Sequence, residues 1–172
     1  VVGSNPASPT IIYSYMEFKF NYGSWNEVRK CWEDYLWPGR DDIEPIVGQT
    51  IGEPLSYDSS IEKNEVSFFV AKCGNKVIGV NSGFNTTPDY YRSRGLWVHK
   101  SFRRKGVALK LLQMTIEDAI HKKNLYVWTI PRESALSTYE KAGFKKVSEF
   151  INENMKYGPN CYALWSLDRP RI

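Results

Sequence analysis

The sequence has few cysteines and histidines, and their placement argues against a disulfide framework or a metal centre. Cys31, Cys73 and Cys161 are far apart and form no C-x-x-C pair. With only two histidines in the chain, the Cys/His spacing of a zinc site is absent, and a nucleophilic cysteine has little choice of histidine partner. We therefore interpret the three cysteines as reduced packing residues and expect no metal.

Long apolar runs are also missing. No run approaches the roughly 18 residues that cross a bilayer, and residues 1–10 lack the basic and apolar regions of a secretory signal. We therefore expect a cytoplasmic protein without a membrane partner, either a monomer or a homodimer. The 172 residues suit one domain. We expect that domain over residues 16–168, with residues 1–15 as a disordered leader or an added segment.

Charge is unevenly distributed, although the net charge is only +4. Residues 92–123 hold nine Lys or Arg against two acids, whereas residues 38–65 hold seven Asp or Glu against two basic residues. A basic segment attracts anions such as phosphates, and an acidic segment attracts cations. The chain is therefore expected to have two poles that suit different partners.

The periodicity of apolar residues predicts a mixed α/β chain. Ser24 and Glu27 form a capping box before a helix that ends at Pro38, and the apolar residues of 107–122 follow a 3.6-residue period. Residues 39–64 are expected to form a loop with at most a short helix. The expected helices are 25–37, 107–122 and 134–142, and the expected strands are 17–20, 66–72, 77–80, 93–98, 125–130, 144–150 and 161–167. The helix after strand 93–98 predicts a parallel crossover to strand 125–130.

A basic turn containing a glycine separates strand 93–98 from the helix that follows it. The first turn of a helix leaves backbone N–H groups unpaired and carries a partial positive charge, so it can bind a phosphate. Gly106 permits close approach to these N–H groups because it has no Cβ. The turn is therefore predicted to bind a phosphate-containing ligand.

Two blocks of sequence resemble motifs of the GCN5-related N-acetyltransferase (GNAT) family. Leu96-Trp97-Val98 followed by Arg103-x-x-Gly106-x-Ala108 resembles the coenzyme A loop, L-x-V and then Q/R-x-x-G-x-G/A. The segment from Ser134 to Phe144 resembles the later block N-x-x-A-x-x-x-Y-x-K-x-G-F. The resemblance extends in outline over most of residues 16–167. It implies a central, twisted, mostly antiparallel sheet with one parallel splayed strand pair and flanking helices.

The resemblance also implies a site for acetyl-coenzyme A (acetyl-CoA). The main chain of strand 93–98 would bind the pantetheine and polarise the thioester carbonyl, and the amides of residues 104–109 would wrap the pyrophosphate. Tyr139 matches the tyrosine that protonates the departing thiolate. Arg132 stands where the family commonly has an asparagine, so its role is uncertain from sequence. The implied cofactor-binding residues are Leu96, Trp97, Val98, Arg103, Arg104, Lys105, Gly106, Val107, Ala108, Leu109 and Arg132.

The implied activity is transfer of an acetyl group to a primary amine by direct attack in a ternary complex. The sequence does not identify the general base, for which Asp89, Glu53 and His99 are candidates. The acidic segment predicts a cationic acceptor, and its relevant residues are Asp41, Asp42, Glu44, Glu53 and Asp58.

The sequence also bears on three other function classes. A nucleotide-binding P-loop is excluded because the chain has no G-x-x-x-x-G-K-[ST] string. A nucleic-acid-binding domain would explain the isoelectric point near 8.9 but not the block around Tyr139, so no nucleic acid is expected. A module that binds acyl-CoA without turnover stays open, because strands 93–98 and 125–130 contain no acid.

Overall fold

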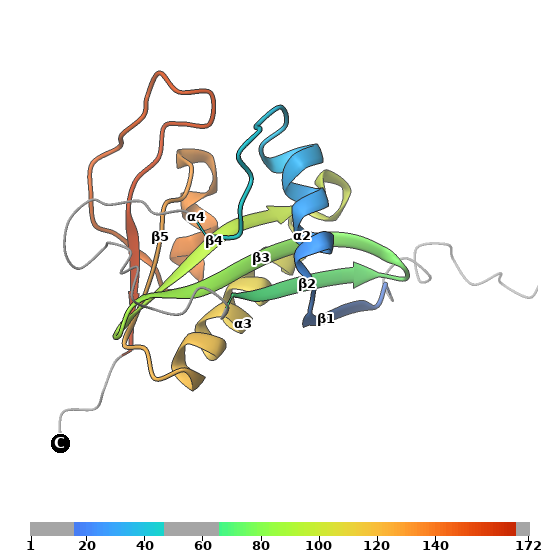
Figure 1. Ribbon diagram of the computed structural model, residues 1–172, viewed down its shortest axis with the longest axis horizontal. Helices are drawn as coiled ribbons and strands as arrows, with labels where there is room; N and C mark the ends of the chain where they lie inside the picture. The colour runs from blue at the N-terminus through green and yellow to red at the C-terminus, as the bar shows by residue number, and fades with distance from the viewer. Residues whose placement is uncertain (1–15, 47–65, 168–172) are drawn as a thin grey trace, which may run out of the picture.

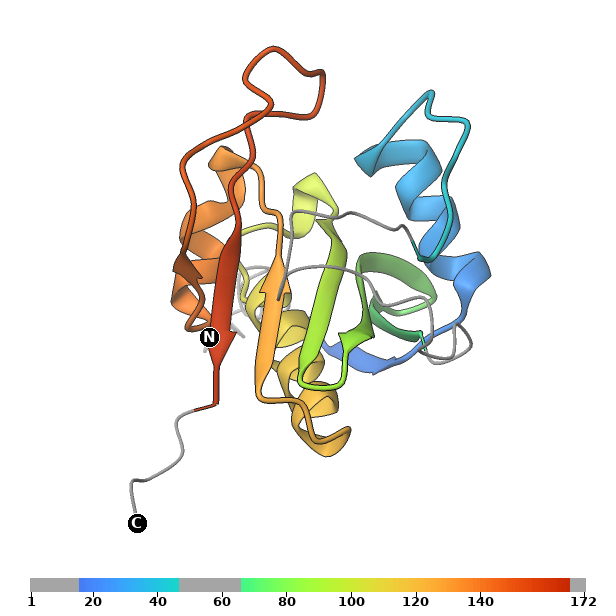
Figure 2. The same cartoon turned by 60° about the vertical axis from the view of Figure 1, so that its left-hand side comes forward.

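The computed structural model describes residues 16–46 and 66–167, which form a seven-stranded sheet with helices on both faces (Figure 1, Figure 2). The strand order is β1-β2-β3-β4-β5-β7-β6, and every neighbouring pair is antiparallel except β4 and β5. The strands are β1 Phe18–Tyr22, β2 Ser67–Cys73, β3 Lys76–Thr87, β4 Tyr90–Val98, β5 Tyr126–Thr129, β6 Lys145–Lys146 and β7 Ala163–Ser166. The expected fold class is thus confirmed.

The helical elements occur in the expected order. They are α2 Trp25–Cys31, the π-helical turn η1 Trp32–Leu36, η2 Lys100–Phe102, α3 Val107–His121, η3 Glu133–Ala135 and α4 Leu136–Lys141. The capping box is present, because the Ser24 hydroxyl accepts from the Glu27 N–H while the Glu27 carboxylate accepts from the Ser24 N–H. None of the helices in the described part of the chain is long and apolar enough to cross a membrane.

Two helices cover opposite faces of the sheet (Figure 1). Phe69 and Ala71 of β2 pack with α3, whereas Val70 between them packs with α2, as the period of two along a strand requires. The apolar stripe expected on α3 is also confirmed for Leu111 and Leu112, which are both completely buried. Because α4 lies on the α3 face as well, the α2 face is less covered near the ends of β4 and β5.

The sequence prediction was wrong about the lengths of several strands. β3 and β4 extend through most of residues 81–92, which lie between the expected strands 77–80 and 93–98, because their polar side chains find partners inside the fold. Asn81 donates to Ser93 and Thr115, and the Trp128 indole donates to Thr86 at 2.9 Å. A buried polar residue with such partners does not interrupt a strand.

The strand expected over residues 144–150 is also much shorter, because only Lys145 and Lys146 form β6. Beyond β6, the Tyr162 N–H donates to the Ser148 hydroxyl at 2.8 Å. A side chain therefore accepts the hydrogen bond that a backbone carbonyl of a paired strand would accept. The strand expected over 161–167 is correspondingly reduced to β7.

A β-bulge in β4 depends on a glycine. The register between β3 and β4 shifts between the Ser82–Arg94 and Val80–Trp97 pairs, and Gly95 in the shifted stretch has φ +80°. The Trp32 indole packs against Gly95 and donates to its carbonyl oxygen at 2.8 Å. A Cβ at this position would overlap the indole ring.

We therefore expect Gly95→Ala to destabilise the protein by about 3 kcal/mol, because it adds left-handed strain to a steric overlap. Gly74→Ala is the matched control, since Gly74 has φ +59° but open space around the added Cβ. Its loss should be about 1 kcal/mol, from strain alone. Urea unfolding of both variants measures the difference, and equal losses would contradict the role of Trp32.

Candidate functional site

The parallel strands β4 and β5 separate part of the way along the sheet. Their pairing covers Tyr90 to Arg92 of β4 and Tyr126 to Trp128 of β5, and the rest of β4 has no β5 partner. The expected splay is therefore present in the fold. A cavity of about 1140 Å³ opens between the two strands, and both contribute to its walls. The backbone edge of β4 from Ser93 onward is thus available to a ligand in this cavity.

The turn that joins β4 to α3 forms one end of this cavity. Gly106 is the N-cap of α3 with φ +80°, and no side chain caps this end of the helix. A Cβ on Gly106 would point into open space. Arg104 in the same turn also has a left-handed φ of 60°. Such a turn directs several backbone N–H groups outward, which suits a pyrophosphate.

The structure places Tyr139 and all of the implied cofactor-binding residues except Lys105 on the cavity wall. Those on the wall are Leu96, Trp97, Val98, Arg103, Arg104, Gly106, Val107, Ala108, Leu109, Arg132 and Tyr139. Lys105 is exposed and is not among the residues that line the cavity, so its expected contact with the cofactor finds no support in the geometry. The Arg103 side chain turns back to donate to the Val98 carbonyl oxygen at 3.1 Å.

Tyr139 is both a core residue and a cavity residue. Its ring packs edge-on against Phe144 with centroids 5.6 Å apart, and only 5% of the residue is exposed. Burial raises the pKa of Tyr139 to about 12, while a hydrogen bond with Thr129 and the charges of Arg132 and Arg92 oppose that increase. The phenol therefore stays protonated at neutral pH and can donate a hydrogen bond into the cavity.

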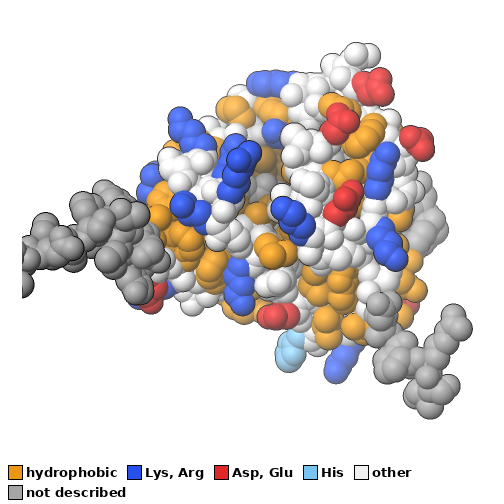
Figure 3. Space-filling view, turned by 180° about the vertical axis from the view of Figure 1, so that it is seen from behind, with side chains coloured by type: hydrophobic (Ala, Val, Ile, Leu, Met, Phe, Trp, Pro, Cys, Tyr) orange, Lys and Arg blue, Asp and Glu red, His pale blue; other side chains and the backbone are white. Residues whose placement is uncertain are grey.

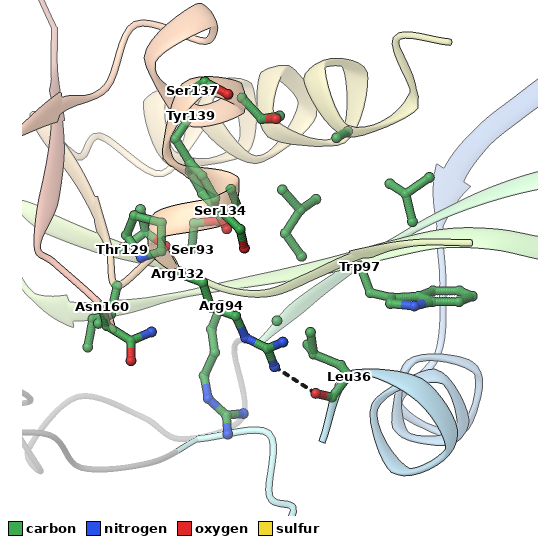
Figure 4. A pocket seen from close by; sticks show the side chains of 18 of the residues that line it. Leu36, Ser93, Arg94, Trp97, Thr129, Arg132, Ser134, Ser137, Tyr139 and Asn160 are labelled. Atoms are coloured by element: carbon green, nitrogen blue, oxygen red, sulfur yellow. Dashed lines mark hydrogen bonds between the residues drawn. The ribbon is translucent and has the colours of Figure 1, made fainter. Parts of the chain in front are cut away.

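Arg132 faces the α2 side of the cavity. Its Nη2 donates to the Leu36 carbonyl oxygen at 2.8 Å, as the dashed line in Figure 4 shows, and its guanidinium lies over the Tyr157 ring at 5.2 Å. These contacts link the β5–η3 connection to the end of η1. A direct contact between Arg132 and the cofactor stays a prediction.

Sequence reasoning missed several polar residues of the cavity. Arg92 and Arg94 of β4 are each 5% exposed, and Ser93 and Thr129 are also buried on the wall. Figure 4 shows Thr129 and Ser93 close to Tyr139, whereas Arg94 donates to the Glu44 carbonyl oxygen. The available signal was the spacing Arg-x-Arg within a strand, since charged residues two apart project from one face.

The candidate carboxylates do not gather here. Among the described residues, the cavity wall contains no Asp, Glu or His. Asp89 lies in the turn before β4, and its carbonyl oxygen accepts from the Tyr126 N–H at 3.1 Å, away from the cavity. His99 also lies off the wall, and its Nδ1 accepts from the Ser101 N–H. Glu53 falls outside the described residues.

The acidic segment is only partly described. Asp41, Asp42 and Glu44 are exposed and do not line the cavity, and Asp42 forms an ion pair with Arg40 at 2.6 Å. Asp58 lies outside the described residues. Viewed from the side opposite α2, the surface carries Lys and Arg side chains around a hollow (Figure 3). The acidic residues that the structure describes thus give no support to a cationic acceptor.

Comparison with known families matches this geometry. The profile of the acetyltransferase (GNAT) domain family matches residues 64–146, a range that includes the splayed strands, the turn at Gly106 and Tyr139. The search of curated protein sequences returned no significant match.

Solved structures share the fold. A putative N-acetyltransferase from Lactobacillus plantarum aligns with a TM-score of 0.63 and 14% identity, covering 87% of this chain and 98% of that one. A Bacillus subtilis acetyltransferase in complex with CoA aligns with a TM-score of 0.56 and 18% identity, covering 88% and 99%. An IAA acetyltransferase from Bacillus cereus aligns at 26% identity with a TM-score of 0.51, covering 59% and 78%.

The match of residues 64–146 and the shared fold both support a relationship to the GCN5-related N-acetyltransferase family. Its members are acyltransferases, so the cavity between β4 and β5 is the candidate site for acyl transfer from a CoA-type donor.

Proposed function

We propose that the protein transfers an acetyl group from acetyl-CoA to a primary amine by direct attack in a ternary complex. The observation that carries the proposal is the continuity of one cavity. It runs from the uncapped N-terminus of α3 along the unpaired edge of β4 to Tyr139. A donor with a phosphate at one end and a thioester at the other suits this arrangement.

The residues of the chain divide into three roles in this proposal. The backbone N–H groups at the start of α3 bind the pyrophosphate, and Arg104 adds positive charge beside them. The unpaired edge of β4 near Leu96 and Trp97 orients the pantetheine and polarises the carbonyl. Tyr139 donates a hydrogen bond to the sulfur as the carbon–sulfur bond breaks.

Deprotonation of the amine is assigned to water. The described cavity wall has no carboxylate or imidazole, so no side chain there is suited to accept the proton near neutral pH. An amine that binds as the neutral base can attack directly, and its nitrogen then loses a proton to water after the attack. We expect the rate to rise with pH through the pKa of the bound acceptor.

The lack of a carboxylate or imidazole on the described cavity wall also favours a second candidate, a module that binds acyl-CoA without turnover. Thermal shift and thiol release separate the two. Acetyl-CoA at about 100 times its Kd should stabilise the protein by about 2.7 kcal/mol. When amines from a panel are then mixed with acetyl-CoA, thiol should be released only if the protein is present. Binding without release from any amine would favour the module, and no thermal shift would contradict both candidates.

A further inference from the structure

A second basic region lies in the cavity, apart from the turn at Gly106. Arg92 and Arg94 are two residues apart on β4, so their side chains project from the same face of the sheet. This is the face of α2 and η1, because the Arg94 guanidinium lies 4.8 Å from the Trp32 ring centroid. Arg40 and Arg132 line the cavity as well. Figure 4 shows Arg94 and Arg132 near Leu36, at the end of η1.

Arg94 is buried, and within the described residues it forms no ion pair with a carboxylate. Its Nη1 donates to the Glu44 carbonyl oxygen at 2.6 Å, and its guanidinium lies over the rings of Trp32 and Trp37. Across residues 16–46 and 66–167, none of the ion pairs includes Arg94. Contacts with carbonyl oxygens and aromatic rings compensate for part of the hydration that the guanidinium loses on burial, but they supply no full negative charge.

The neighbouring charges make this burial more costly. Desolvation lowers the pKa of Arg94 to about 9, and the positive charges of Arg92 and Arg40 add to the effect, whereas the carboxylate of Asp42 opposes it. Desolvation also lowers the pKa of Arg92 to about 10. Both side chains stay charged at neutral pH. An anion placed between them would relieve the repulsion and would replace part of the lost hydration.

This region is too far from the turn at Gly106 to bind the same phosphates. Arg94 lies four residues before Val98, which is about 13 Å along a strand, and the turn begins beyond Val98. The donor's thioester would lie between the two regions, beside the unpaired edge of β4. An acceptor that approaches from the α2 face therefore meets the arginines first.

We propose that the acceptor amine carries a carboxylate, and that Arg94 binds this carboxylate with Arg92 beside it. This inference rests on the proposed function, because it names the class of acceptor for the same cavity. A carboxylate suits the planar, multidentate guanidinium. The proposal replaces the expected cationic acceptor, since Asp41, Asp42 and Glu44 lie off the cavity wall and the arginines would repel a second positive charge.

Matched acceptors test the proposal on the intact protein. We would compare amino acids with their primary amides, for example glycine with glycinamide and phenylalanine with phenylalaninamide, by thiol release from acetyl-CoA. With kcat/KM referred to the neutral amine at the assay pH, the acid should exceed the amide by about tenfold to a hundredfold, the order of one charge-assisted hydrogen bond. Equal values, or a preference for the amides, would overturn the proposal.

Variants then assign the preference to Arg94. Arg94→Met should bring the ratio of acid to amide close to one, and Arg94→Lys should retain part of the preference, while both keep the thermal shift with acetyl-CoA. Arg29→Met is the control, because Arg29 is an exposed arginine on α2 that lies off the cavity wall. An unchanged ratio in Arg94→Met, with the acetyl-CoA shift intact, would contradict the role of Arg94.

A binding measurement on the wild-type protein tests the proposal even if no turnover is detected or the Arg94 variants do not fold. N-acetylglycine and N-acetylphenylalanine should raise the melting temperature of the wild-type protein, whereas their amides should not. Equal shifts from acids and amides would overturn the carboxylate site. Loss of the acetyl-CoA shift and of all thiol release would instead contradict the proposed function, so the two failures are distinguishable.

Discussion

Gly106→Glu should abolish the thermal shift that acetyl-CoA produces in the wild-type protein. The Cβ of residue 106 would point into the open end of the cavity, and the carboxylate would add negative charge where the pyrophosphate is expected. A ligand-induced stabilisation of about 2.7 kcal/mol corresponds to about 5 to 10 °C for a chain of this size. In the variant this shift should fall below about 1 °C.

The variant's own stability needs a control, because residue 106 has a left-handed backbone. Gly74→Glu makes the same substitution at φ +59°, in the hairpin between β2 and β3. It should lower the melting temperature by a similar amount through strain, yet keep the full shift with acetyl-CoA. An unchanged shift in folded Gly106→Glu would exclude the turn as the phosphate site.

Tyr139→Phe should lower kcat about tenfold to a thousandfold and leave the acetyl-CoA thermal shift unchanged, because only the hydroxyl is lost. The ring keeps its edge-on contact with Phe144, so the fold should persist. Because burial raises the pKa of Tyr139 to about 12, above that of an ordinary thiol, complete proton transfer to the departing thiolate is unfavourable. Tyr139 should therefore act as a hydrogen-bond donor while the bond breaks.

The pH dependence distinguishes this role from that of a group that titrates. Because burial raises the pKa of Tyr139, its hydroxyl keeps the proton below about pH 11, and the ratio of wild-type to variant kcat should be constant from pH 6 to 9. Tyr126→Phe is the control, since Tyr126 stacks on Tyr90 away from the cavity and should keep wild-type kcat. Wild-type turnover in Tyr139→Phe would make Tyr139 a packing residue only.

The sequence predicted well the elements whose signals are local. The capping box at Ser24, the 3.6-residue stripe of α3 and the glycine at its N-terminus depend on residues within a few positions of one another. The same holds for the two blocks that resemble the GNAT family. Local patterns therefore sufficed for the fold class and for the turn expected to bind phosphate.

Only the tertiary structure decided which charges surround the acceptor end of the cavity. The sequence shows Arg92 and Arg94 as two more residues of a basic segment, and it shows Asp41, Asp42 and Glu44 as an acidic pole. Their placement depends on contacts between distant parts of the chain, such as the hydrogen bond from the Arg132 side chain to the carbonyl oxygen of Leu36, which is 96 residues away in the sequence. Charge along a sequence fixes the sign of a segment, whereas burial decides whether that charge faces a ligand or water.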